Sequence, residues 1–320
     1  MSQPDKRPVP SAKDLRDLVQ IWFYGTNDER RSLANVYGEP IGVWKVGEIT
    51  DFSNVFRYVD ITDEDLSGWD MSNAISTIGM FYNASGFVGN GLDEWDVSSL
   101  MYASNMFAHV TEFQANLTEW DVGKVTEFSY MFHGAEKFNG NITEWNTESG
   151  TNFQGMLKGA KSFSQNISKW DLAEAIDTSM MFEGCSEFDS DLSGWNLQAV
   201  KTMKAMFNEA EKFNQDLTKW DVTDVKDASQ MFRYTSLDHD YCEWTYQLGN
   251  ETNVGRMFFG TQCDVQADPR VSNDTDGKRC GPLCYDCGCE SPGSGAFSTT
   301  TTSIAPTLTL VVGLLSYLFG

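Results

Sequence analysis

The stretch Asn116-Leu-Thr-Glu-Trp-Asp-Val-Gly-Lys-Val-Thr-Glu-Phe-Ser-Tyr-Met-Phe-His133 decides the fold, because its pattern recurs along the chain. Every step between successive tryptophans from Trp95 to Trp220 is 25 residues. A period of this length is typical of a solenoid, in which one coil buries its apolar face only against neighbouring coils. The ten tryptophans are Trp22, Trp44, Trp69, Trp95, Trp120, Trp145, Trp170, Trp195, Trp220 and Trp244.

Three apolar anchors recur in each coil. In Leu117-Thr-Glu-Trp-Asp-Val122, tryptophan and valine alternate with an outward aspartate, as they would in a short β-strand. About eleven residues further on stands a Met-Phe pair such as Met131-Phe132, and a single phenylalanine such as Phe138 follows. The sequence therefore predicts an α/β repeat solenoid, leucine-rich-repeat-like, with a parallel sheet on the concave face. Short helical or irregular turns are expected on the convex face, and a cap helix at the N-terminus.

This pattern resembles that of the BspA-like family of surface leucine-rich-repeat proteins, in its Trp-Asp-Val subtype. Two matching stretches are Lys212-Phe-Asn-Gln-Asp-Leu-Thr-Lys-Trp-Asp-Val222 and Val125-Thr-Glu-Phe-Ser-Tyr-Met-Phe-His-Gly-Ala135. The resemblance covers about residues 41–260, with local departures at Trp145-Asn-Thr147 and Tyr241-Cys-Glu-Trp244-Thr-Tyr246. It implies a binding or adhesion role at the cell surface or after secretion, without catalytic residues and without a particular ligand.

The composition divides the chain into four predicted regions. Ser11-Ala-Lys-Asp14 resembles the capping box that opens a helix, so residues 11–24 are expected to form the cap helix. The periodicity ends after Met257-Phe258 and gives way to cysteines. The regions are a polar lead with the cap helix (1–40), a solenoid of about nine coils (41–261), a cysteine-rich C-terminal cap (262–290), and a flexible spacer with an apolar membrane-attachment tail (291–320).

The chain is strongly acidic, with 23 Lys and Arg residues against 46 Asp and Glu residues and a formal net charge of -23. The entire excess lies between residues 41 and 290. Such a surface repels phosphate backbones, which argues against nucleic acid as a partner. Divalent cations, basic proteins and neutral glycans are all compatible with this charge.

Six cysteines at the end of the repeats form an even set. Three disulfide bonds are the favoured prediction, with the connectivity left open, and a zinc site is the alternative because clustered thiolates also bind zinc. The seventh cysteine, Cys185, stands where other coils carry alanine and is expected to be a small buried thiol. The set of six comprises Cys242, Cys263, Cys280, Cys284, Cys287 and Cys289.

The C-terminal segment 291–320 has the layout of a GPI-attachment signal. Small residues, with Ser294 as the expected lipidation site, are followed by a threonine-rich spacer and an uncharged apolar end. A short membrane span over 304–319 is the alternative, although a helix of this length rises only about 24 Å against a hydrocarbon core of about 30 Å. The sequence thus predicts a cell-surface protein anchored to the membrane at its C-terminus, although the first 30 residues show no signal peptide.

Six Asn-x-Ser/Thr sequons are candidate glycosylation sites. Three of them recur at one coil position, where Asp191 and Asp216 stand in later coils. Either glycans attach at this position, or asparagine and aspartate hydrogen-bond the turn that enters the expected strand. The sequon asparagines are Asn83, Asn116, Asn141, Asn166, Asn250 and Asn273, of which Asn116, Asn141 and Asn166 are the recurring three.

The residue directly after each tryptophan is the candidate ligand-facing position. Stacked in neighbouring strands, these residues would form a ladder on the concave face that binds Ca²⁺ or a basic partner, since carboxylate oxygens suit hard cations. The alternative is a structural role, in which each aspartate hydrogen-bonds the strand end. No cofactor is predicted apart from a possible Ca²⁺ at this ladder, and the identity of any metal is left open. The ladder comprises Asp70, Asp96, Asp121, Asn146, Asp171, Asn196 and Asp221.

No catalytic site is predicted. His109, His133 and His239 stand at unrelated offsets, and the chain contains no nucleophile-elbow or phosphate-loop motif. The expected function is that of a non-enzymatic cell-surface binding or adhesion protein, whose acidic concave face meets a protein or glycan ligand. The alternative is a structural wall or matrix component that collects cations without a specific ligand. An enzyme that acts on polysaccharide is the third and least favoured interpretation.

Overall fold

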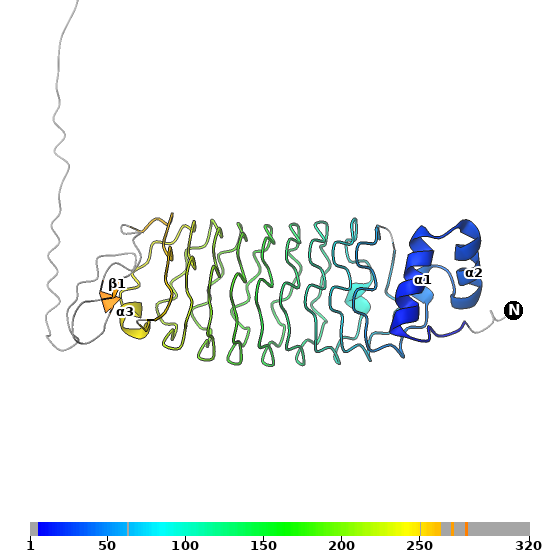
Figure 1. The fold of residues 1–320 in the computed structure, drawn as a ribbon, viewed down its shortest axis with the longest axis horizontal. Coiled ribbons are helices and arrows are strands. Elements are labelled where there is room, and N and C mark those ends of the chain that lie inside the picture. Colours follow the sequence, from blue (N-terminus) through cyan, green and yellow to red (C-terminus); the bar gives the residue numbers. More distant parts are fainter. Residues whose placement is uncertain (1–5, 63, 250, 264–269, 272–278, 281–320) are drawn as a thin grey trace, which may run out of the picture. The chain divides into compact units, whose positions relative to one another are not determined.

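The computed structural model describes residues 6–62, 64–249, 251–263, 270–271 and 279–280 (Figure 1). The chain forms two compact units, Met1–Cys289 and Glu290–Gly320, and every described residue belongs to the first. This unit begins with two helices, continues as a stack of similar coils and ends with a short helix and two short strands. The predicted tail with Ser294 lies outside the described residues. None of the helices in the described ranges is long and apolar enough to cross a membrane.

Helix α1, Ala12–Tyr24, covers the first coil. It begins after Ser11, whose hydroxyl accepts a hydrogen bond from the Asp14 amide at 3.1 Å. Its apolar face buries Leu15 and Val19 completely. The Trp22 ring meets the Trp44 ring edge to face at a centroid distance of 5.6 Å, so the irregular spacing of Trp22 reflects its place in the helix.

Helix α2, Asn27–Tyr37, follows directly and packs on α1. Thr26 and Glu29 form a complete capping box at its start. None of its residues is fully buried, which is why its sequence lacks the apolar periodicity that would have predicted it. Short 3₁₀ turns follow at Ile41–Val43 (η1) and, within the stack, at Leu92–Glu94 (η2).

The coils contain no β-strand in the described residues, so the predicted α/β solenoid with a parallel sheet on its concave face is wrong. Neighbouring coils share isolated parallel bridges of one residue per coil in place of strands. The coils lie side by side in sequence order (Figure 1). The bridged residues, each paired with the next, are Asp51, Ser76, Tyr102, Glu127, Asn152, Asp177, Thr202, Asp227 and Asn253.

The Trp-Asp-Val segment is a corner of the coil and not a strand. The Trp120 amide donates to the Leu117 carbonyl at 3.2 Å, so this hydrogen bond stays within one coil. The Asp121 carboxylate accepts from the Gly123 amide at 3.0 Å, which closes an Asx turn. Buried tryptophan, exposed aspartate and buried valine alternate in this corner as they would in a strand. The alternation alone therefore could not distinguish the two structures.

The backbone links between coils are concentrated around the Met-Phe pair. The amides of Phe128, Tyr130 and Phe132 donate to carbonyls of the next coil, while the amides of Met131 and His133 donate within their own coil. Tyr130 has φ 57°, in the left-handed region that the third residue of a type II turn requires. Each coil thus contributes a run of linked turns that holds the stack together. The bonds to the next coil are Phe128–Asn152, Tyr130–Gln154, Phe132–Met156 and Gly134–Lys158, at 2.7–2.9 Å.

Tryptophan forms the spine of the core. From Trp44 to Trp244, every tryptophan of the stack is at most 5% exposed. Neighbouring rings stack nearly parallel from Trp95 to Trp170 and between Trp195 and Trp220; Trp120 and Trp145, for example, have a centroid distance of 6.4 Å and an angle of 3°. The indole N–H of Trp145 donates to the Leu117 carbonyl of the preceding coil at 2.9 Å, and equivalent bonds recur from Trp69 to Trp220. Tryptophan therefore fills the core and also satisfies a buried carbonyl.

The C-terminal end of the unit contains α3, Trp244–Gln247, and a pair of two-residue antiparallel strands, β1 (Arg270–Val271) and β2 (Arg279–Cys280). Cys242 and Cys263 each take part in a disulfide bond. Cys185 is a buried free thiol that donates to the Leu157 carbonyl, and burial raises its pKa. The other cysteines of the predicted set, Cys280, Cys284, Cys287 and Cys289, have no described side chain.

Candidate functional site

All seven residues of the predicted ladder are exposed, and each closes a corner of its coil. One side-chain oxygen of each accepts a hydrogen bond from the amide two residues further on. Hydrogen bonds from Ser98 hold the pKa of Asp96 below its ordinary value, and those from Thr223 act likewise on Asp221. Because aspartate and asparagine serve equally in this turn, the corner explains the position without a ligand. The residues are Asp70, Asp96, Asp121, Asn146, Asp171, Asn196 and Asp221.

The excess negative charge gathers around these corners, on a surface that we call the tryptophan edge. It contains 15 Asp and Glu residues and three Lys residues. Two of its acids, Glu144 and Asp224, pair with lysines of neighbouring coils. Within the described part of the chain, no group of three His, Cys, Asp or Glu side chains is placed to hold a metal ion, so no ligand set for Ca²⁺ is identified there. The edge comprises residues 65–73, 90–99, 116–124, 141–149, 166–174, 191–199 and 216–224.

The recurring sequon asparagines form a second row of corners. Asn116, Asn141 and Asn166 are exposed, and the Oδ1 atom of each accepts from the amide of the sequon Thr or Ser at 3.0–3.3 Å. Asp191 and Asp216 form the same turn in later coils. The turn therefore explains why these residues recur. Asn83 is also exposed, and Asn250 and Asn273 lie outside the described residues.

The runs of linked turns form a second surface, which we call the turn face. Unlike the tryptophan edge, it carries no acidic excess, with five basic and two acidic residues. Its side chains also differ from coil to coil, so its chemistry is not explained by the repeat. The turn face comprises residues 53–58, 78–83, 104–109, 129–134, 154–159, 179–184, 204–209, 229–234 and 255–260.

An aromatic row occupies the beginning of the turn face. The Tyr58 and Tyr82 rings meet edge to face at a centroid distance of 5.5 Å, and Tyr82 meets His109 in the same way at 5.4 Å. The Arg57 guanidinium lies 4.4 Å from the centre of the Tyr82 ring. Tyr58 is 58% exposed, so the row is open to solvent at its first ring.

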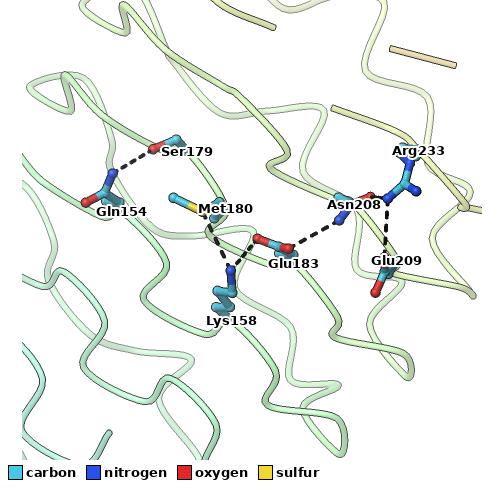
Figure 2. Close-up of polar contacts among 8 residues, drawn as sticks. All are labelled: Gln154, Lys158, Ser179, Met180, Glu183, Asn208, Glu209 and Arg233. Atoms are coloured by element: carbon cyan, nitrogen blue, oxygen red, sulfur yellow. Dashed lines mark hydrogen bonds and ion pairs between the residues drawn. The ribbon is translucent and has the colours of Figure 1, made fainter. Parts of the chain in front are cut away.

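A chain of polar side chains continues the turn face over the following coils (Figure 2). Lys158 pairs with Glu183 at 2.8 Å, and the Asn208 amide donates to the same carboxylate at 3.2 Å. Arg233 in turn donates to the Asn208 side-chain oxygen at 3.2 Å. Each contact joins neighbouring coils, so these side chains hold one another in fixed positions.

Three glycines keep the backbone bare beside this polar chain. Gly134, Gly159 and Gly184 have φ between 68° and 72°, a region that favours glycine. A Cβ atom on Gly159 would lie 3.6 Å from the Gly134 Cα atom. The His109 ring lies over Gly134, whereas Gly159 and Gly184 meet only glycine backbone and leave a flat strip next to Lys158 and Glu183.

His109 and His133 meet on the turn face, which their unrelated offsets in the sequence did not predict. Their ring centroids are 4.4 Å apart, with the ring planes at 60°. His109 is the last residue of its turn-face segment, and His133 is the last residue but one of the next segment. The two histidines are therefore separated by one residue less than the repeat length, and this offset brings their rings together. Burial, with His109 and Lys158 nearby, lowers the pKa of His133 to about 4, so that its ring is neutral at pH 7. His239 lies elsewhere, against the Asn214 carbonyl at 3.0 Å.

An open pocket of about 410 Å³ lies beside the N-terminal helices. Trp22 from α1, Arg30 and Arg31 from α2, and Glu64 contribute to its lining. The Trp22 indole N–H donates to the Glu64 carboxylate at 3.2 Å. None of the residues that the sequence analysis singled out as a site lines this pocket.

A family described as "Mycoplasma protein of unknown function, DUF285" matches the chain at residues 32–99, 80–195 and 165–268. The three matches cover residues 32–268 without a gap, which is well over half of the chain. No curated protein and no solved structure matches it. The family match therefore extends over all the coils that carry the tryptophan edge and the turn face.

Proposed function

The chain belongs to the DUF285 family, and we propose that it is a non-enzymatic binding protein of the cell surface whose turn face holds an extended glycan. The observation that carries this proposal is the aromatic row, in which Tyr58, Tyr82 and His109 line up across neighbouring coils. Partly exposed aromatic rings on a rigid surface are typical of binding faces. The resemblance of the same coils to BspA-like surface proteins supports the proposal.

The spacing of the coils favours a glycan over a peptide. Coils joined by bridges repeat about every 4.8 Å, comparable with the length of one hexose unit in an extended chain. An extended peptide advances about 3.3 Å per residue, so its side chains would fall out of register with the rings. Sugar units over the aromatic row would place their apolar faces on its rings. Units further along the same glycan would place their hydroxyl groups near Lys158, Glu183 and Asn208.

The distribution of charge and polar contacts favours the turn face over the tryptophan edge. Each ladder residue of the edge already uses one oxygen to close its corner, as Asp121 does with the Gly123 amide. The turn face lacks the acidic excess of the edge, so it repels neither a neutral nor a weakly acidic glycan. The acidic edge favours a second candidate function, that of a wall or matrix component that collects cations.

We also propose that the protein lies outside the cytoplasm. The disulfide-bonded state of Cys242 and Cys263 supports it, because disulfides persist in oxidising compartments. Attachment to the membrane through residues 291–320, with Ser294 as the lipidation site, is the anchoring that we propose. A carbohydrate partner also fits this location.

Binding of the full chain to a glycan array, followed by titration of the strongest glycan, tests the proposed face. We expect Tyr58→Asn combined with Tyr82→Asn to weaken binding at least about tenfold, since this corresponds to losing about 1.4 kcal/mol of ring contact. Asparagine already stands at the equivalent positions of other coils, in Asn83 and Asn208, so both turns can be retained.

The matched control is Asp121→Asn combined with Asp171→Asn on the tryptophan edge. Asn146 and Asn196 show that asparagine closes the same corner, so this variant removes charge and keeps the fold. We expect it to bind the glycan as the unchanged protein does. Loss of binding in this control, with full binding in the tyrosine variant, would assign the ligand to the tryptophan edge. A chain that binds no glycan on the array would refute the proposed ligand class.

A further inference from the structure

The two histidines of the turn face form a cluster, of which the proposed glycan site uses only the His109 ring. His109 and His133 come from neighbouring coils, and both rings are partly buried. Neither imidazole forms a hydrogen bond with any residue that the structure describes, although their ring centroids are only 4.4 Å apart. The described residues therefore leave the ring nitrogens of both histidines available to bind a ligand.

The geometry of the pair fits a shared metal ion. Imidazole nitrogens bind Zn²⁺ at about 2.0–2.1 Å, which puts two nitrogens about 3.4 Å apart in a tetrahedral site. The ring centroids lie behind the nitrogens, so they would be about 5.2 Å apart in a tetrahedral site and about 4.5 Å apart in a square-planar one; the observed 4.4 Å fits the square-planar arrangement that Cu²⁺ adopts. The planes cross at 60°, so the rings are not stacked face to face and their nitrogens can point towards one position.

The surroundings hold the pair in place. A Cβ atom on Gly134 would lie 2.9 Å from Nδ1 of His109, so this glycine makes the space that the ring occupies. Tyr82 contacts the His109 ring at 5.4 Å, and Tyr130 contacts the His133 ring at 5.5 Å. The positive charge of Lys158 would oppose a cation, but its ion pair with Glu183 at 2.8 Å offsets that charge.

We propose that His109 and His133 together form a two-histidine site for a divalent transition-metal ion. Imidazole ligands suit Cu²⁺, Ni²⁺ and Zn²⁺, and the affinity order places Cu²⁺ first. The described residues offer no third His, Cys, Asp or Glu ligand beside the pair, so water or a bound ligand completes the coordination. Ca²⁺ prefers oxygen ligands and is excluded from this pair. The inference does not depend on the glycan proposal.

Calorimetric titration of the full, non-reduced chain with CuCl₂ and with ZnCl₂ tests the site. His109→Gly copies Gly134, and His133→Asn copies Asn208, so each variant carries a residue that the same coil position accepts elsewhere. We expect one tight equivalent of Cu²⁺ in the unchanged protein and at least a tenfold loss of affinity in either variant. His239→Asn, which alters a histidine outside the turn face, should leave the affinity unchanged.

The electron paramagnetic resonance spectrum of the bound Cu²⁺ gives a second readout that requires no variant. Hyperfine coupling to two imidazole nitrogens is expected in the unchanged protein, and CaCl₂ should not displace the ion. Coupling to one nitrogen or none would overturn the proposal. So would equal Cu²⁺ affinity in a protein that carries both His109→Gly and His133→Asn, because the ion would then be held elsewhere.

Discussion

Replacing Trp145 by alanine is expected to lower the free energy of unfolding by about 3–5 kcal/mol. The ring is 3% exposed and stacks between Trp120, at 6.4 Å, and Trp170, at 6.2 Å. Its removal leaves a cavity at the centre of the stack and takes away one of the two donors of the Leu117 carbonyl, which keeps only the Trp120 amide. Urea unfolding followed by circular dichroism measures the loss. Because neighbouring coils support one another, the whole stack should unfold at lower urea.

The matched variant Trp145→Phe distinguishes the contribution of ring packing from that of the indole hydrogen bond. Phenylalanine keeps most of the aromatic packing but lacks the N–H group that donates to Leu117 at 2.9 Å. We expect a smaller loss, of about 0.5–1.5 kcal/mol, because the Leu117 carbonyl loses one hydrogen bond and keeps the one from the Trp120 amide. If alanine at this position costs less than about 1 kcal/mol, the tryptophan spine does not stabilise the stack as described.

Replacing Val19 by aspartate is expected to release the N-terminal cap. Val19 is fully buried on the face of α1 that covers the first coil, and an unpaired carboxylate there costs several kcal/mol. Once α1 detaches, the apolar end of the stack is exposed and should associate with other copies. Size-exclusion chromatography with light scattering should show concentration-dependent oligomers, and the melting temperature should fall.

The control is Gln20→Asp, which introduces the same carboxylate one residue further along α1. Gln20 is exposed, so the charge remains in water and the cap stays in place. This variant should remain as monomeric and as stable as the unchanged protein. Equal behaviour of the two variants would contradict the assignment of α1 as the cap.

The period of the tryptophans sufficed to predict coils of about 25 residues with tryptophan inside, but it did not determine the backbone of those coils. Trp120-Asp-Val122 was interpreted as a strand because in-out-in alternation is the mark of a half-buried strand. An Asx corner produces the same alternation, and in the structure the Asp121 side chain closes that corner. The sequon residues Asn116 and Asn141 likewise close turns, which is the structural role predicted as the alternative to glycan attachment.

The turn face and its histidine pair were missed, although the sequence contained a signal for them. Glycine stands at Gly155 and Gly159, at the two turn positions where other coils place Tyr130 and His109 in the left-handed region. Glycine recurring at fixed positions indicates turns with positive φ. Aligning the coils on these glycines would have placed the links between coils at the Met-Phe pair. The contact between His109 and His133 depends on the exact stagger of neighbouring coils, which the repeat length alone does not fix.

Amide hydrogen exchange tests most directly whether the turn runs hold the coils together. The amides of Phe128, Tyr130 and Phe132 donate to the next coil and should be protected to the level of global unfolding. The amide of Asp121 makes no hydrogen bond with any described residue, and on an exposed corner it should exchange rapidly. Strong protection at Asp121 together with rapid exchange at Tyr130 would contradict this structure. Such a result would mean that the backbone hydrogen bonds between coils lie at the Trp-Asp-Val segments.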